Sequence, residues 1–223
     1  MAEFIFMLTR DDKTVSNCLE IIELISQVGI RHIGFKDVGV DPQTMGTLTQ
    51  EIHRIGALAY LEVVETDSKK NVDAANVAVD IGVDRLLGGV DAENILETLG
   101  DSDVEYFPFP GKPIGHPTKL GGSPTQVAKD CRRFEKLGCA GVDLLAYRAF
   151  DAQALDLIRA ARSALSGQLI VAGDIDSPKR VQELSAAGAD AFTIGSAIFD
   201  GAFISGNGEI VPQLQGVLLA CRH

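Results

Sequence analysis

The sequence predicts an α/β protein, a (β/α)8 barrel that occupies residues 1–223 as one domain. Two observations lead to this prediction. Short apolar segments alternate with amphipathic helical segments, which is typical of parallel βαβ units. The alternation occurs eight times along the 223 residues, and eight units are the number that closes such a barrel. An open, doubly wound sheet would show the same alternation, so only the count of eight favours the closed form.

Each expected strand is a short run rich in Val, Ile, Leu and Phe, as expected for strands that are covered on both faces. The helical segments before the strands usually end in glycine, as in "RRFEKLGCAGVDLLAY", because glycine readily takes the left-handed conformation that stops a helix. The expected strands cover residues 3–8, 31–36, 58–64, 84–88, 104–109, 141–147, 168–173 and 190–195.

The composition excludes several classes of protein. A net charge of −11 disfavours a nucleic-acid partner, since phosphate contacts need clustered Lys and Arg. No apolar run approaches the ~18 residues that cross a bilayer, and we expect no membrane partner. The N-terminal residues do not resemble a signal peptide, and the four cysteines (Cys18, Cys131, Cys139 and Cys221) lack metal-site spacing. Buried thiols in a cytoplasmic protein are the expectation.

The longest strand-to-helix connection is "FPGKPIGHPTKLGGSP", residues 109–124, whose Pro and Gly content predicts neither helix nor strand. In a barrel this connection lies on the C-terminal face, where such loops build active sites. We therefore expect it to form a lid or part of the mouth, with His116 and Lys119 as residues that could reach a ligand. A surface excursion without a function is the alternative.

The last two expected strands each end in a glycine-bearing turn that leads into a helix, at Gly173-Asp174 and at Gly195-Ser196. Glycine lets the backbone come close to a ligand, and the first N–H groups of a helix are unpaired donors. Two such turns side by side suit a phosphate group. The loops after strands seven and eight are also where phosphate sites recur in these barrels.

The stretch "VAGDIDSPKRVQELSAAGADAFTIGSAIFDG", residues 171–201, resembles the C-terminal signature of the ribulose-phosphate-binding barrel superfamily. That superfamily includes the histidine-biosynthesis isomerases, ribulose-phosphate 3-epimerase, N-acetylmannosamine-6-phosphate epimerase and the keto-gulonate-phosphate decarboxylase group. The resemblance covers about a sixth of the chain in detail and implies a phosphorylated small-molecule substrate. It implies that the substrate phosphate is bound by Gly173, Asp174, Gly195 and Ser196, with the Ser177 hydroxyl as a further candidate.

The chain departs from this pattern at one position. Many members carry Gly-Gly at the first turn, whereas this chain has Gly173-Asp174. A carboxylate beside a phosphate repels it unless the carboxylate points away or pairs with a cation. The Asp174 side chain is therefore not expected to bind the phosphate, although its N–H group can.

Two charged residues interrupt neighbouring apolar strands. Strand alternation places Lys36 with Gly34 and places Glu62 with Tyr60, while the apolar residues between them suit the helix layer. Lys36 and Glu62 are thus expected to face the lumen on adjacent strands, where unpaired charge is expensive. A salt bridge that only fills the barrel is one interpretation. The other is a catalytic pair, in which the carboxylate removes a proton beside a carbonyl and the ammonium stabilises the enediolate.

Further candidates follow other strands. Asp143 on the sixth strand is a second carboxylate across the mouth, or alternatively an Asp that caps the strand entry. Arg10 after the first strand and Tyr147 after the sixth are candidate mouth residues, whereas His32 is expected to be structural. No cofactor is required, although Mg²⁺ held by Glu62 and an Asp is left open, because several decarboxylase-type relatives use this ion.

The leading functional hypothesis is a phosphosugar isomerase or epimerase that works by acid/base enolisation. The alternative is a lyase of the same barrel type, a decarboxylase or aldolase, in which Lys36 stabilises the enediolate or forms a Schiff base. A non-catalytic phospholigand sensor is a third hypothesis. Barrels of this type often dimerise, so a homodimer is also left open.

Overall fold

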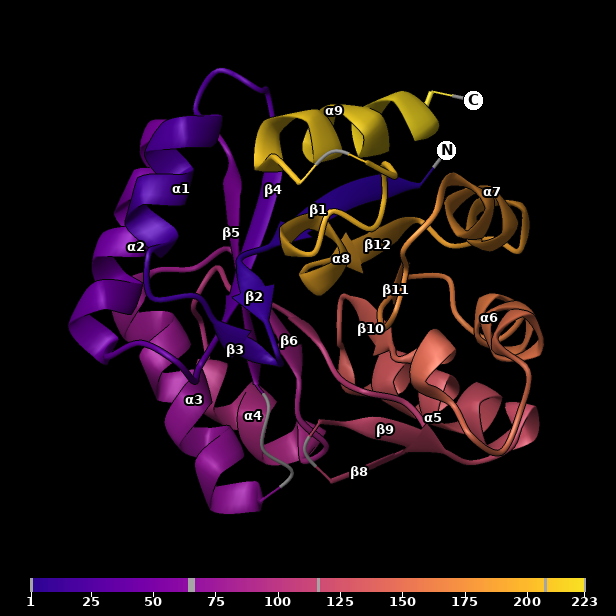
Figure 1. The fold of residues 1–223 in the computed structure, drawn as a ribbon. Coiled ribbons are helices and arrows are strands. Elements are labelled where there is room, and N and C mark those ends of the chain that lie inside the picture. Colours follow the sequence, from indigo (N-terminus) through magenta and orange to yellow (C-terminus); the bar gives the residue numbers. More distant parts are fainter. Residues whose placement is uncertain (1, 64–66, 116, 207, 223) are drawn as a thin grey trace.

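Within the residues that the computed structural model describes, which are all except 1, 64–66, 116, 207 and 223, eight parallel strands form a barrel (Figure 1). The helices surround the strands, as expected for a (β/α)8 architecture. All eight expected strands are present, and each lies within its predicted range but is shorter than predicted. The barrel strands are β1 (Glu3–Met7), β4 (His32–Lys36), β5 (Leu58–Val63), β6 (Arg85–Gly88), β7 (Glu105–Phe107), β10 (Gly141–Leu144), β11 (Gln168–Val171) and β12 (Ala191–Ile194).

The sheet closes on itself, which rules out the open alternative. Hydrogen-bonded strands run in the order β10-β11-β12-β1-β4-β5-β6-β7, so β7 and β10 are the two ends of the series. The Ala140 N–H group donates to the Tyr106 carbonyl at 3.1 Å, and the Asp143 N–H group donates to the Pro108 carbonyl at 3.0 Å. These two bonds join the ends and complete the barrel.

The helices begin and end where the sequence chemistry predicts. Asp41 and Ser123 accept hydrogen bonds from backbone N–H groups three residues later, and proline follows each of them. Gly82 and Gly138 end their helices in the left-handed conformation. The helices are α1 (Cys18–Ile25), α2 (Pro42–Arg54), α3 (Ser68–Ile81), α4 (Ala92–Leu99), α5 (Pro124–Leu137), η1 (Ala146–Arg148), α6 (Ala154–Arg162), α7 (Pro178–Ala186), α8 (Ser196–Phe199) and α9 (Ile210–Ala220).

Alternation along the strands divides the core into two layers. The larger layer packs the outward faces of the strands against the helices. The smaller layer fills the lumen of the barrel and includes Ile5, Met7, Tyr60, Leu87, Phe107 and Ile170. A Cβ at Gly34 would collide with the Met7 sulfur, so glycine there makes room for a lumen side chain. The lumen is therefore packed through its middle, and only its C-terminal end is open to a ligand.

Two hairpins lie at this C-terminal end of the barrel, and one of them shows that the prediction for residues 109–124 was wrong. Residues 109–124 were expected to hold no strand, yet β8 (Lys112–Ile114) and β9 (Lys119–Gly121) pair antiparallel there. Pro113 is tolerated because a two-stranded ribbon has free edges that need no N–H donor. The second hairpin, β2 (Thr9–Arg10) with β3 (Lys13–Thr14), follows β1 directly.

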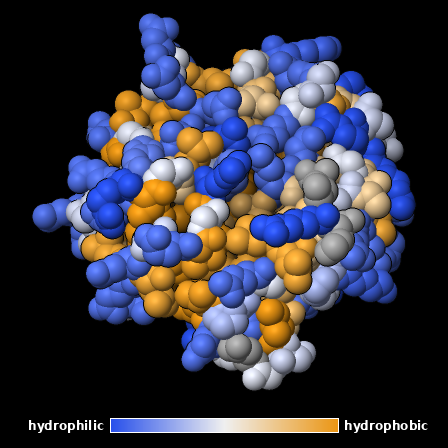
Figure 2. Space-filling model, turned by 90° about the horizontal axis from the view of Figure 1, so that it is seen from above, coloured by the Kyte–Doolittle hydropathy of each residue, from blue (hydrophilic) through white to orange (hydrophobic). Residues whose placement is uncertain are grey.

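The structure also bears on the predictions about membrane contact and about the cysteines. Among the described residues, no helix is long and apolar enough to cross a membrane. Cys18, Cys131 and Cys139 are buried free thiols, whereas Cys221 is half-buried. The face seen from above in Figure 2 shows apolar patches among hydrophilic side chains. The homodimer and the cytoplasmic location remain predictions.

Candidate active site

Lys36 is the centre of the site, at the C-terminal end of β4. Its side chain is buried inside the mouth of the barrel, and its ammonium lies 3.1 Å from Glu62 Oε1 on the adjacent strand β5. The register aligns Lys36 directly with Glu62. Strand alternation thus predicted correctly that these two side chains share the lumen face.

Asp12, in the turn of the β2–β3 hairpin, gives Lys36 a second carboxylate partner. Asp12 Oδ1 lies 2.5 Å from the Lys36 ammonium, and the Asp12 side chain is only 2% exposed. The turn places Asp11 and Asp12 in the left-handed region, at φ 51° and 62°, which Asp tolerates better than most residues. The ammonium is therefore held between carboxylates from two different segments.

Thr14 holds the same hairpin against the backbone of Lys36. The Lys36 N–H group donates to Thr14 Oγ1 at 2.8 Å, and this hydroxyl donates to the Lys36 carbonyl at 2.9 Å. A Cβ at Gly39 would lie 2.9 Å from the Thr14 nitrogen, so a side chain there would push the hairpin away. The hairpin thus fixes both the backbone and the side-chain terminus of Lys36.

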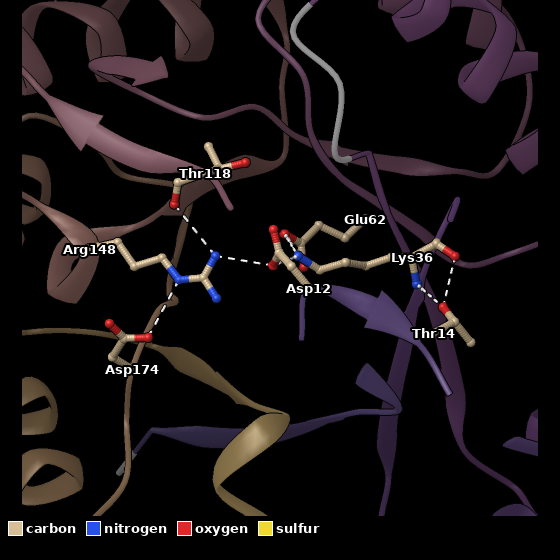
Figure 3. Close-up of polar contacts among 7 residues, drawn as sticks. All are labelled: Asp12, Thr14, Lys36, Glu62, Thr118, Arg148 and Asp174. Atoms are coloured by element: carbon tan, nitrogen blue, oxygen red, sulfur yellow. Dashed lines mark hydrogen bonds and ion pairs between the residues drawn. The ribbon is translucent and has the colours of Figure 1, made fainter. Parts of the chain in front are cut away.

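Arg148, the last residue of η1, extends the row of charges across the mouth (Figure 3). Its Nη1 lies 3.1 Å from Asp12 Oδ1, and its Nε lies 3.6 Å from Asp174 Oδ1. The same Nη1 donates to the Thr118 carbonyl at 3.4 Å. A charged row therefore runs Glu62–Lys36–Asp12–Arg148–Asp174, with alternating sign, and its members come from five separate segments.

The row fixes the protonation of its inner members. Burial by itself would lower the pKa of Lys36, but the carboxylates of Glu62 and Asp12 outweigh burial and raise this pKa. Burial would likewise raise the pKa of Asp12, yet Lys36 and Arg148 lower it to about 2. At neutral pH the site therefore presents an ammonium ion and an ionised Asp12.

Asp143 on β10 is the exception to this pairing. It is fully buried, and neither carboxyl oxygen has a hydrogen-bond partner among the described residues. Burial raises the pKa of Asp143 well above its ordinary value, Glu62 raises it further, and Lys36 and Arg148 oppose the change. Burial without a hydrogen-bond partner thus favours the protonated form of Asp143, since an unpaired buried carboxylate is costly.

A cavity of about 470 Å³ opens above these residues, and we call it the main cavity. Asp12, Lys36, Glu62 and Arg148 line it together with the two glycine turns at Gly173–Asp176 and Gly195–Ala197. A Cβ at Gly173 would lie 2.6 Å from Arg148 Cγ, and one at Gly195 would collide with Thr9 Oγ1. The glycines are thus required for the turns to approach the charged row.

The candidate phosphate residues do not all reach the main cavity. Gly173, Asp174, Gly195 and Ser196 line it, but Ser177, at the start of α7, does not. The Asp174 carboxylate faces the Arg148 guanidinium, and its carbonyl accepts a hydrogen bond from Arg180. Asp174 therefore has the cationic neighbour that a carboxylate close to a phosphate requires.

The mouth candidates that the structure describes, Arg10, Lys119 and Tyr147, do not line the main cavity. Arg10 is exposed and forms an ion pair with Asp200 at 2.8 Å. Lys119 and Tyr147 line a neighbouring cavity of about 460 Å³, which we call the side cavity. His116 lies outside the described residues.

In the part of the chain that the structure describes, no group of three or more His, Cys, Asp or Glu side chains could hold a metal ion. The Lys36 ammonium occupies the position between Asp12 and Glu62 where a cation would neutralise both carboxylates. The use of Mg²⁺ by this chain remains untested.

Sequence reasoning missed Asp12, Arg148 and Arg180. Asp12 lies two residues beyond the candidate Arg10, and Arg148 lies one residue beyond the candidate Tyr147. Strand alternation stops at the end of a strand, so it gave no direction for either side chain. The one available signal was the pair of adjacent aspartates in "RDDK", which is typical of a tight turn.

Comparison with solved structures places this architecture among known barrels. The α-subunit of tryptophan synthase from Pyrococcus furiosus, in a mutant form, superposes with a TM-score of 0.69 at 13% identity and covers 100% of this chain and 98% of its own. Orotidine 5'-phosphate decarboxylase from Pyrococcus horikoshii gives a TM-score of 0.65 at 15% identity, over 99% of both chains. These matches confirm the (β/α)8 barrel that the resemblance implied. No protein-family model and no curated protein sequence matches the chain.

Proposed function

We propose that this chain is an enzyme that acts on a phosphorylated small sugar, as an isomerase or epimerase working by enolisation. One observation carries the proposal. An ammonium held between two carboxylates lines the same cavity as two glycine turns at the ends of β11 and β12. The charged row suits proton transfer, and the turns suit a phosphate, so one ligand can engage both.

In this proposal the phosphate binds at the turns, where the guanidinium groups of Arg148 and Arg180 also line the cavity. Backbone N–H groups and guanidinium ions are the usual phosphate donors in proteins. Because Gly173 and Gly195 have no Cβ atoms, a phosphate can come close to the backbone of the two turns. Ser196 contributes its hydroxyl as a further donor.

The reacting carbons then lie beside Lys36 and Glu62, which also line the main cavity. The Glu62 carboxylate removes a proton from the carbon beside the carbonyl, and the Lys36 ammonium stabilises the negative charge that develops on the oxygen. Asp143 does not line the main cavity. In this proposal it is the second acid/base group, and burial together with the nearby Glu62 charge raises its pKa and favours its protonated form.

A lyase is the second candidate, and the raised pKa of Lys36 decides which kind. A Schiff base needs a neutral amine, which the two carboxylates oppose. An ammonium that is charged in the resting enzyme instead suits a decarboxylation, because it can give one proton to the carbanion that remains after CO₂ leaves. A decarboxylase is also among the solved structures that share the fold, which supports keeping this candidate.

The test is a thermal-shift screen of small phosphosugars, with inorganic phosphate and unphosphorylated sugars for comparison. A ligand at 100 times its dissociation constant should stabilise the protein by about 2.7 kcal/mol. Ser196→Asp should abolish this stabilisation through charge repulsion, and Ser16→Asp, at an exposed position that lines neither cavity, should retain it. If no phosphorylated compound stabilises the wild type, the proposal is wrong. Product analysis by NMR with the best ligand separates isomerisation from release of CO₂.

A further inference from the structure

The side cavity is the feature that the proposed reaction leaves unused. It has a volume of about 460 Å³, close to that of the main cavity, and the two cavities share Asp12, Arg148, Asp174 and Ser196 on their walls. The Asp12–Arg148–Asp174 part of the charged row is therefore a common wall between two spaces. A small phosphosugar in the main cavity would leave the second space unfilled.

Away from the charged row, the side cavity is lined mainly by apolar and aromatic residues. Phe150 is among them, with 58% of its surface exposed, beside Tyr147 and Pro117. Exposed aromatic rings that line a cavity are typical of sites for flat ligands, because stacking adds to apolar burial. The Arg180 guanidinium lies 5.3 Å from the centre of the Tyr147 ring and holds that ring in place.

This apolar lining is a fixed part of the fold. The Phe150 N–H group donates to the Leu120 carbonyl at 3.2 Å, so the segment after η1 is bound to β9. Asp151 accepts a hydrogen bond from the Gly122 N–H group at 3.0 Å, and Asp130 accepts one from the Gly111 N–H group at 3.0 Å. These hydrogen bonds fix the backbone around Phe150 and Lys119, because they join the segment after η1 to β9 and join the start of the β8–β9 hairpin to α5.

The charges in the side cavity differ in availability. Asp12 and Asp174 already face the Arg148 guanidinium. Lys119 is exposed and forms no ion pair with any residue that the structure describes. Its ammonium is therefore available to donate to an oxygen of a ligand.

We propose that the side cavity is a second subsite, which binds a flat, unsaturated part of the substrate that carries an oxygen acceptor. The flat part stacks on Phe150, and the oxygen accepts a hydrogen bond from Lys119. This inference rests on the proposed function, because the phosphate of the same ligand occupies the main cavity. It narrows the proposed substrate to a phosphosugar that carries a flat substituent, with its reacting carbons beside the charged row.

The test measures binding of three probes by calorimetry: inorganic phosphate, phenyl phosphate and 4-carboxyphenyl phosphate. Both aryl phosphates should bind more tightly than inorganic phosphate. Phe150→Ala should weaken both aryl phosphates by about tenfold, which corresponds to ~1.4 kcal/mol. Lys119→Ala should weaken only 4-carboxyphenyl phosphate, and neither variant should change the affinity for inorganic phosphate.

The same hairpin supplies matched controls. Lys112 and Ile114 are exposed residues of β8 that do not line the side cavity, and Lys112→Ala and Ile114→Ala should bind all three probes as the wild type does. Aryl phosphates that bind no more tightly than phosphate, or that are unaffected by Phe150→Ala, would overturn the subsite while leaving the phosphate site intact. If inorganic phosphate does not bind but 4-carboxyphenyl phosphate binds and its binding depends on Lys119 and Phe150, the proposed function fails and the subsite stands.

Discussion

Both ends of the barrel lumen carry charged residues, but the two ends differ in how completely these residues are paired. At the N-terminal end, the Tyr60 hydroxyl accepts from Arg85 Nη1 at 2.6 Å and pairs with His32 Nδ1 at 2.8 Å. Arg85 also binds Glu105 at 2.8 Å and lies over the rings of Tyr60 and Phe107. At the C-terminal end, Asp143 is buried with both oxygens unpartnered among the described residues, and a cavity opens beside Lys36.

This difference separates a structural network from a chemical one. In the network at the N-terminal end, Tyr60, His32 and Arg85 are partnered with one another or with Glu105, and aromatic rings pack beside them, which is typical of a structural network. The network at the C-terminal end holds an ammonium ion, an ionised carboxylate and, on β10, the buried carboxyl group of Asp143, whose pKa is raised. Groups whose protonation is driven in opposite directions are typical of sites for acid/base chemistry. Variants at matched positions of the two ends test the distinction.

The largest expected effect comes from removing the cation at each end. Lys36→Met should lower turnover of the substrate by about 10²–10³-fold, because the developing oxyanion loses its stabilising charge. Arg85→Met should lower stability by about 1–3 kcal/mol, because Tyr60 and Glu105 lose hydrogen bonds, and should leave turnover unchanged. Steady-state kinetics and urea unfolding of both variants provide the measurement.

Lys36→Met also leaves Glu62 without its cation and Asp12 with Arg148 alone, which should cost about 3–5 kcal/mol at neutral pH. The double variant Lys36→Met/Glu62→Gln removes one of these charges and should recover part of that stability without recovering turnover. Recovered turnover in the double variant would contradict the assigned role of Lys36.

Asp143→Asn should have the next largest effect. The raised pKa of Asp143 means that the folded protein binds a proton that the unfolded chain releases above about pH 4. Wild-type stability therefore falls as pH rises above this value, by up to about 1.4 kcal/mol per pH unit from this group. Asn carries no such proton, so the variant should gain stability over the wild type between pH 4 and pH 8.

The same variant should lower turnover by about 10²-fold, because the amide cannot exchange a proton. Urea unfolding at several pH values gives the first result, and kinetics gives the second. A variant that is less stable than the wild type at pH 8 would show that Asp143 is ionised in the folded protein.

Asp12→Asn should change how both stability and the reaction rate depend on pH. The wild-type pKa of about 2, lowered from 3.8, means that ionised Asp12 stabilises the fold above pH 4 and that this stability is lost as pH falls from about 4 to about 2. The variant should lack this loss. Its Lys36 should also have a lower pKa, because one carboxylate is gone, so the alkaline limb of the rate profile should move to lower pH. An unmoved alkaline limb would mean that Asp12 does not control Lys36.

The smallest effect is expected at the lower end, from His32→Gln. Burial lowers the pKa of His32 below 6.5, Glu3 opposes the change, and Arg85 and Arg31 support it. Neutral His32 therefore stabilises the fold above pH 6.5, and this stability decreases as pH falls below that value. Thermal unfolding between pH 5 and pH 7 should be less pH-dependent in the variant, with turnover unchanged. A change in turnover would break the distinction between the two ends.

Particular residues show how far the sequence predicts this molecule. The barrel and the lumen position of Lys36 and Glu62 follow from the strand count and from the period of two, because both depend on local pattern. Asp12 reaches Lys36 only because a hairpin folds back over β4. Arg148 contacts Asp12 although the two residues are 136 positions apart in the sequence. Such contacts are set by tertiary structure, so no local pattern reveals them. The strands β8 and β9 were missed because Pro and Gly obscure a ribbon that is held by its neighbours.

The central claim is that the charged row at the C-terminal end performs proton transfer on a phosphorylated substrate. The most direct test is ¹H NMR of the phosphosugars that stabilise the protein, incubated with enzyme in D₂O. The wild type and Arg85→Met should exchange the hydrogen on the carbon beside the carbonyl for deuterium, whereas Lys36→Met and Ser196→Asp should not. The absence of exchange with every phosphosugar, or exchange that persists in Lys36→Met, would contradict the account.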